Sequence, residues 1–159
     1  MPRSLALSLA VATLIGCSST PEQPLLQQFF AASRLRDNTM LAGFATTAFE
    51  PGVDGIVTTF SITNLTPEQR KPLPAGSIVV DLSINGGPTH VEISSDDGEL
   101  VSKEVSISAP VKLPSGQTVR KNYLVTMQRA ILRGGKPTIG RWIITGIREA
   151  AGAASTPRS

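Results

Sequence analysis

Apolar residues recur at helical spacing in the part of the chain that follows residue 20. Residues Thr20 to Gln23 read Thr-Pro-Glu-Gln, which combines a capping-box pattern with proline at the first helical position and predicts a helix start. The apolar stripe continues to about Arg36, and Asp37 or Asn38 can cap a second, shorter helix. The apolar positions are Leu25, Leu26, Phe29, Phe30 and Ala32 in the first helix, and Met40, Leu41 and Phe44 in the second.

Beyond the turn-rich segment Glu50–Gly55 the apolar period becomes two, which is the period of β-strands. Apolar or β-branched residues alternate over residues 56–62, and again over residues 78–84 after the proline-rich connection Pro67–Pro74. The stretch Asn85–Asp97 is polar and poorly patterned. We therefore expect strands in the two alternating segments and a loop in the polar one.

The turn Pro114-Ser115-Gly116 predicts a long β-hairpin. A two-residue loop would set Val111 opposite Arg120, whereas a three-residue loop with Gly116 in the left-handed position aligns apolar residues with one another. We therefore expect the second register. It pairs Val111 with Val119, Ile107 with Tyr123 and Val105 with Val125. A last strand, Ile139–Ile147, would contain Trp142 and bring the sheet to about five strands.

The first residues of the chain form an export pattern. Arg3 precedes the apolar stretch Leu5–Leu14, which is too short to span a bilayer and has the flanks of a secretory signal. The segment Leu14-Ile15-Gly16-Cys17 that follows resembles the lipobox of bacterial lipoproteins, in which the leader is removed and the cysteine thiol carries a lipid. An ordinary signal peptide with an incidental cysteine, or a buried helix, are the alternatives. By the same resemblance, Ser18 favours the periplasmic face of the outer membrane.

These patterns divide the chain into four parts. We expect a lipoprotein signal peptide over residues 1–16, a lipidated N-terminus and short tether over 17–21, a single α+β domain over 22–148 and a flexible tail over 149–159. In the domain, N-terminal helices would pack on a curved, mostly antiparallel sheet.

Two segments of the domain carry a family resemblance. The run Leu25 to Asp37 followed by Met40-Leu41-Ala42, and the later Gly140 to Ile144, are similar to the opening helices and final strand of the nuclear transport factor two-like superfamily. The resemblance implies a cone-shaped domain. Members of this superfamily include ketosteroid isomerase-like and polyketide cyclase-like enzymes, dimerisation modules and binding domains. The fold alone therefore does not indicate the function of this protein.

The amino-acid composition excludes several kinds of functional site. The chain has 159 residues with one histidine and one cysteine, which excludes zinc ribbons, disulfide frameworks and most histidine-based catalytic relays. We expect no metal and no cofactor. Residues 18–98 carry a net charge of −5 and residues 99–159 a net charge of +7. An aromatic content of 4% disfavours nucleic-acid binding, and anionic lipid, cell-wall polymer or an acidic protein surface suits the basic half better.

Several residues are candidates for acid-base chemistry, although none lies in a catalytic motif of the superfamily. These are Asp37, Asp81, Glu92 and Tyr123. We interpret Asp37 as a helix cap, Asp81 as facing away from the apolar side of its strand, and Tyr123 as a core tyrosine with a satisfied hydroxyl, the alternative being that it donates into a pocket. His90 is expected to lie in a solvated loop. The Asp96–Glu99 segment is expected to be a turn and not a calcium site, because its spacing is unlike an EF-hand loop.

The hairpin register places three cations on the inward side. Lys103, Lys121 and Arg129 share the parity of Ile107 and Val125. Lys121, near the turn, would reach the rim of the sheet. Lys103 and Arg129 would either extend out of the core or, with Tyr123, line a pocket for a small anionic or carbonyl-bearing ligand.

The sequence therefore predicts a lipid-anchored cell-envelope protein that is not an enzyme and that binds a small molecule or a protein partner, including a second copy of itself. The alternative is a pocket enzyme that isomerises, cyclises or hydrates a small organic substrate by acid-base chemistry. Two polar side chains converging deep in an apolar cavity would favour the enzyme, whereas an interior filled by Phe, Ile and Leu would favour a scaffold.

Overall fold

The computed structural model of the protein describes residues 20–73, 77–84, 87–93, 97–133 and 138–150. Side chains are described for these residues outside 77–93 and Thr138. The described chain begins with helices α1 (Glu22–Leu35) and α2 (Asn38–Ala42). Neither described helix is long and apolar enough to cross a membrane.

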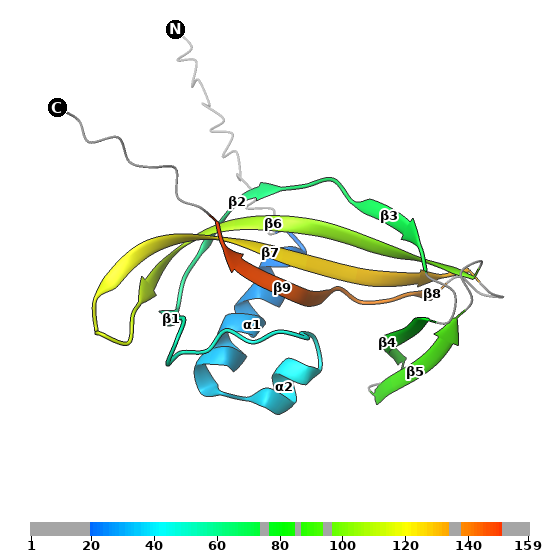
Figure 1. The fold of residues 1–159 in the computed structure, drawn as a ribbon, viewed down its shortest axis with the longest axis horizontal. Coiled ribbons are helices and arrows are strands. Elements are labelled where there is room, and N and C mark those ends of the chain that lie inside the picture. The colour runs from blue at the N-terminus through cyan, green and yellow to red at the C-terminus, as the bar shows by residue number, and fades with distance from the viewer. Residues whose placement is uncertain (1–19, 74–76, 85–86, 94–96, 134–137, 151–159) are drawn as a thin grey trace, which may run out of the picture.

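The described strands form two separate antiparallel sheets. The larger is seven-stranded and curved, and the helices lie beneath its concave face (Figure 1). It contains β1 (Ile56–Val57), β2 (Ser61–Leu65), β3 (Gln69–Pro72), β6 (Gly98–Lys112), β7 (Thr118–Leu132), β8 (Thr138–Ile139) and β9 (Ile143–Glu149). The smaller is the pair β4 (Ser77–Ile84) and β5 (Gly87–Ile93). An α+β fold with a curved sheet is thus confirmed, with more than the expected five strands.

The long pair β6–β7 organises the larger sheet. Strands β1, β2 and β3 follow one another along the free edge of β6, while β8 and β9 pair with the other edge of β7. Each long strand has 15 residues, which leaves room for several short partners in succession. This explains strands that the sequence pattern missed.

Three predictions about the strands were wrong. Strand β3 lies inside the expected proline-rich connection, where Pro72 ends an edge strand and its missing N–H does no harm. Strand β5 lies inside the stretch Asn85–Asp97, because backbone pairing with β4 does not require apolar alternation. The expected last strand is divided into β8 and β9, and Trp142 lies between them.

The predicted hairpin register is confirmed. Val111 pairs with Val119, Ile107 with Tyr123 and Val105 with Val125. Gly116 has a φ of 88°, which is the left-handed conformation expected of it. Its N–H donates to the Leu113 carbonyl at 2.8 Å.

Of the two predicted helix caps, the cap of α2 forms and the capping box of α1 does not. Asp37 caps α2 as expected, since its Oδ1 accepts a hydrogen bond from the Met40 N–H at 2.8 Å. The N-cap of α1, Pro21, makes no side-chain hydrogen bond, so the predicted capping box does not form there. The carboxylate of Glu22 instead pairs with a residue of β6, as described below.

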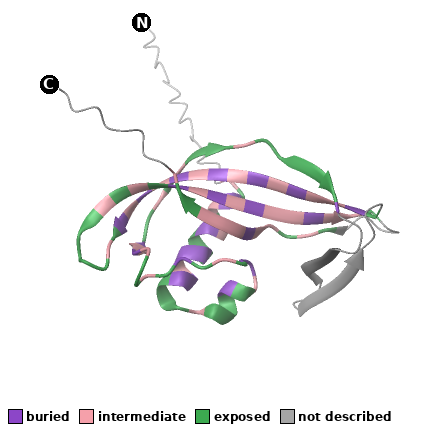
Figure 2. Cartoon of the chain, in the orientation of Figure 1, coloured by how far each residue is buried: buried purple, intermediate pink, exposed green. Residues whose placement is uncertain are grey.

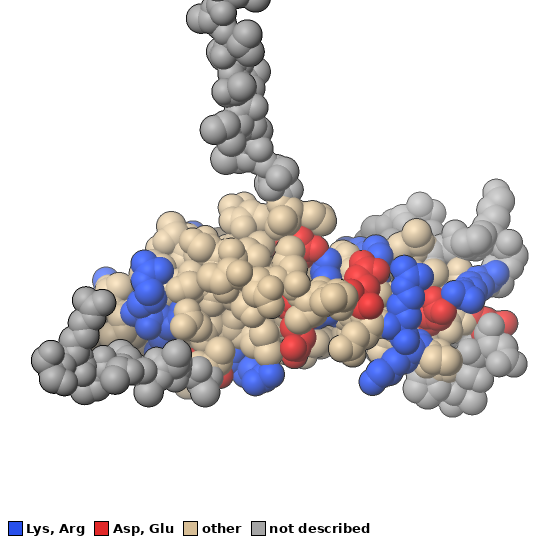
Figure 3. All heavy atoms as spheres, turned by 90° about the horizontal axis from the view of Figure 1, so that it is seen from above, with Lys and Arg blue, Asp and Glu red and all other residues tan. Residues whose placement is uncertain are grey.

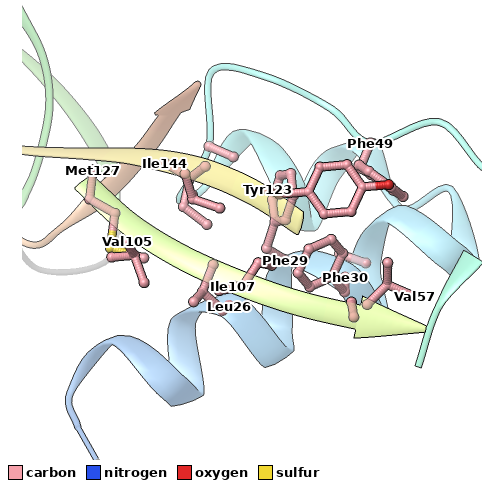
Figure 4. Close-up of a cluster of buried hydrophobic side chains, with 14 of the residues drawn as sticks. Leu26, Phe29, Phe30, Phe49, Val57, Val105, Ile107, Tyr123, Met127 and Ile144 are labelled. Atoms are coloured by element: carbon pink, nitrogen blue, oxygen red, sulfur yellow. The ribbon is translucent and has the colours of Figure 1, made fainter. Parts of the chain in front are cut away.

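The core fills the space between the helices and the concave face. Buried residues alternate along β6 and β7, and the buried side of α1 faces them (Figure 2). The close-up in Figure 4 shows the cluster, in which Phe30 and Tyr123 both make edge-to-face contacts with Phe49. The largest wholly buried side chains are Leu26, Phe29, Val101, Val105, Ile107, Val111, Val125, Met127 and Ile144.

Candidate functional site

Lys103 lies on the concave face of β6, on the same side as Val105 and Ile107, as the register predicts. Its side chain is only 8% exposed, and its ammonium group forms an ion pair with the carboxylate of Glu22, the first residue of α1. The ammonium also lies 4.1 Å from the centre of the Trp142 ring. A buried lysine is therefore held by one carboxylate and one aromatic ring.

Arg129, on β7, reaches the same aromatic ring. Its guanidinium carbon is 4.5 Å from the centre of the Trp142 ring, and its Nη2 donates a hydrogen bond to Glu68 Oε1 at 3.0 Å. The structure thus brings together two of the predicted ligand-binding residues, Lys103 and Arg129. We name this group, with Glu22, Glu68 and Trp142, the Trp142 cluster.

The Trp142 cluster is electrically balanced, because each of its cations has its own carboxylate. Burial by itself would raise the pKa of the Glu22 carboxyl, but the hydrogen bond and charge of Lys103, together with hydrogen bonds from the Glu22 backbone and Thr20, outweigh burial, and the pKa is lowered. Glu68 also approaches Arg70, which in turn approaches Glu99. Figure 3 shows that positive and negative side chains are also interspersed on the face seen from above, across one half of the molecule. The cluster therefore has little net charge with which to attract an anion.

Tyr123 is not part of the Trp142 cluster. It pairs with Ile107, whereas Lys103 pairs with Met127, four residues farther along β7. Tyr123 lines a cleft of about 200 Å³ at the edge of the core, which we name the Tyr123 cleft. Its other lining residues are Ala48, Phe49, Val53, Asp54, Lys121, Ile147, Arg148 and Glu149.

Tyr123 is 5% exposed as a residue, and within the described part of the chain its hydroxyl has no hydrogen-bond partner. In Figure 4 the hydroxyl lies at the end of the ring that points away from Ile144 and Met127. Burial, with the negative charges of Glu149 and Asp54, raises the pKa of Tyr123 to about 12. The hydroxyl therefore stays protonated at neutral pH.

The charged residues around the cleft come from distant parts of the sequence. Lys121 Nζ lies 2.7 Å from Glu149 Oε2, so this lysine is paired with a carboxylate at the cleft. Asp54 Oδ2 accepts a hydrogen bond from the Glu50 N–H at 2.7 Å. Sequence reasoning missed Phe49 and Asp54, because the only signal in their segment was the turn composition of Glu50–Gly55.

A second cavity of about 340 Å³ lies on the other side of the same segment and shares Ala48 and Phe49 with the Tyr123 cleft. It lies between the end of α1, the start of α2 and residues 48–52. Ser33 and Arg36 line it, and the Ser33 hydroxyl is buried without a hydrogen-bond partner in the described structure. Arg36 has a φ of 55°, a conformation rare outside glycine and asparagine.

The remaining candidates are dispersed or undescribed. Asp37 serves as the cap of α2, and Glu99 lies 2.6 Å from Arg133 Nη2. Among the described residues no three histidine, cysteine or acidic side chains gather in a way that could hold a metal ion. Cys17 and Asp96, and the side chains of Asp81, His90 and Glu92, lie outside the described part.

Comparison of this chain with protein-family models, with curated proteins and with solved structures finds no match.

Proposed function

We propose that this protein is a lipid-anchored protein of the bacterial cell envelope whose domain, residues 22–148, binds a small molecule and catalyses no reaction. The domain is proposed to be of the nuclear transport factor two-like type, with the helices and the curved sheet as the two sides of a cone. Both proposals rest on the sequence patterns described above and on the geometry of the core and the clefts.

One observation argues against a pocket enzyme: the space between the helices and the concave side of the sheet is filled. Phe29, Ile107 and Met127 are each wholly buried in one core cluster, so these side chains leave no internal substrate pocket between them. The buried Lys103 is neutralised by Glu22 and does not face an apolar cavity. Among the described residues, two cavities lie beside Phe49 at the edge of the core. The ligand is therefore proposed to bind at this edge, in the Tyr123 cleft.

The anchor is proposed to be a lipid on Cys17. Only Ser18 and Ser19 separate this cysteine from Thr20, the first described residue, so the tether spans roughly 10 Å at about 3.3–3.6 Å per residue. Several acyl carbons at about 0.8 kcal/mol per buried methylene would make the attachment effectively permanent. The domain would then stay close to the bilayer, and Ser18 favours the periplasmic face of the outer membrane.

A small-molecule screen on the full chain in detergent tests the proposal. Tyr123 is the only tyrosine, so its ring resonances report on the cleft without ambiguity. We expect at least one compound both to raise the melting temperature and to shift these resonances in a saturable way. If no compound does either, the small-molecule proposal is wrong. A partner protein or a second copy of the chain that shifts the same resonances would replace it.

A further inference from the structure

Resting on the proposed function, we infer that the Tyr123 cleft binds a small molecule through a protonated primary amine. The inference rests on three properties of the cleft: the sign of its uncompensated charge, the free hydroxyl of Tyr123 and the aromatic wall formed with Phe49.

The uncompensated charge of the cleft is negative. Lys121 is neutralised by Glu149 at 2.7 Å. The Arg148 side chain is 68% exposed, and its Nη2 lies 3.8 Å from Glu104. Asp54 forms no ion pair within the described part of the chain, and its carboxylate accepts one hydrogen bond, from the backbone N–H of Glu50. A cation that enters the cleft would therefore find an unpaired carboxylate at its side.

The Tyr123 hydroxyl adds a directional contact. Its oxygen has no hydrogen-bond partner in the described structure although the residue is almost fully buried, so a ligand N–H can donate to it. Glu149 and Asp54 line the same cleft as this hydroxyl, and their negative charges help to raise its pKa. A primary ammonium group carries three N–H donors, so it can donate both to the hydroxyl oxygen of Tyr123 and to the carboxylate of Asp54 in the same cleft.

The walls and the size of the cleft select a compact ligand. The rings of Phe49 and Tyr123 meet edge to face, with their centres 5.4 Å apart, and both line the cleft. An ammonium within about 6 Å of such a ring gains cation–π attraction. The volume of about 200 Å³ is below the range of about 300–1,000 Å³ typical of drug-sized ligands, so only a few heavy atoms fit.

Titration of the full chain in detergent at neutral pH, with ethanolamine as the probe, tests this inference. Two controls need no mutation: choline keeps the charge but has no N–H, and ethylene glycol has similar size but no charge. The Asp54→Asn variant removes the charge and retains an oxygen for the Glu50 N–H. Tyr123→Phe removes only the hydroxyl, and Glu68→Gln removes a carboxylate in the Trp142 cluster.

We expect saturable shifts of the Tyr123 ring resonances with ethanolamine, and affinities at least about tenfold lower for choline and ethylene glycol. By calorimetry, Asp54→Asn should weaken ethanolamine binding about tenfold and Tyr123→Phe about threefold, while Glu68→Gln should bind as the parent does. Equal binding of the three probes, or an unchanged affinity in a folded Asp54→Asn variant, would overturn the inference. If ethanolamine fails but another compound shifts the Tyr123 resonances, the inference is wrong and the proposed function stands. If no compound binds, both are wrong.

Discussion

Glu22 and Lys103 form an ion pair that joins the first residue of α1 to the concave face of β6, and their side chains are only 5% and 8% exposed. The pair holds the start of the helix against the sheet at the point where the chain leaves the undescribed N-terminal segment. Its isolation from water decides how the protein should respond to mutation and to acid.

Removing one partner of this pair should cost far more than removing both. Glu22→Gln leaves a buried lysine without a counter-ion, and we expect the free energy of unfolding to fall by roughly 3–5 kcal/mol. The double variant Glu22→Leu with Lys103→Met should be close to the parent in stability. Urea unfolding followed by the fluorescence of Trp142, the only tryptophan, measures both. Glu68→Gln, which breaks the more exposed pair with Arg129, is the control and should cost at most about 1 kcal/mol.

The same pair predicts an acid-sensitive fold. The pKa of Glu22 is lowered from its ordinary value of 4.5 in the folded state, so its contribution to stability is present above about pH 4.5 and is lost as the pH falls through the folded pKa. Stability measured between pH 7 and pH 3 should therefore decline more steeply for the parent than for Glu22→Gln. Parallel pH profiles for the two proteins would contradict this role of Glu22.

Tyr123 predicts the opposite behaviour in alkali. Its pKa rises from 10.0 to about 12 on folding, so its contribution is present below pH 10 and is lost as the pH rises toward 12. The absorbance of the phenolate should titrate near pH 12 in the native protein and near pH 10 in denaturant. Tyr123→Phe should lose less stability than the parent between these pH values. A native midpoint near 10 would mean that the hydroxyl is well solvated.

Alanine substitutions at three glycines should reduce stability by different amounts, because the glycines differ in backbone conformation and in the space around them. Gly55 has a φ of 97°, and an added Cβ would lie 2.7 Å from the Lys112 carbonyl oxygen. Gly116 has a φ of 88° but open space around it, and Gly52 has open space and no left-handed conformation. Alanine should therefore be nearly neutral at Gly52, cost about 1–2 kcal/mol at Gly116 and cost clearly more at Gly55. The same urea experiment ranks them, and equal costs at Gly55 and Gly116 would show that the close approach to β6 is relaxed.

Replacing Cys17 by serine should release the protein from the membrane fraction and leave the leader uncleaved, because lipid attachment and processing are both proposed to occur at this residue. Fractionation together with mass measurement of the N-terminus tests this. A Ser18→Thr variant should behave as the parent and serves as the control. Normal membrane retention of Cys17→Ser would end the lipoprotein proposal.

The sequence by itself determined the local and regularly patterned features of the fold. The strict alternation around Pro114-Ser115-Gly116 specified the pairing of Ile107 with Tyr123, because a shift of one residue would turn every apolar side chain outward. The Asp37 cap of α2 was also readable, since a cap depends on residues within one turn. The same register placed Lys103 on the core side of the sheet without indicating its partner.

Tertiary structure alone decided which distant residues meet. The partners of Lys103 and Arg129 are Glu22 and Glu68, which are 81 and 61 residues away in sequence, and Trp142 comes from a third segment. The Tyr123 cleft likewise combines an irregular segment containing Phe49 and Asp54 with the end of β9. No periodicity marks such contacts, because ion pairs and clefts depend on how curved elements pack in space. Strand β3 was hidden for the same reason: its pairing follows from the long free edge of β6 and not from its own residues.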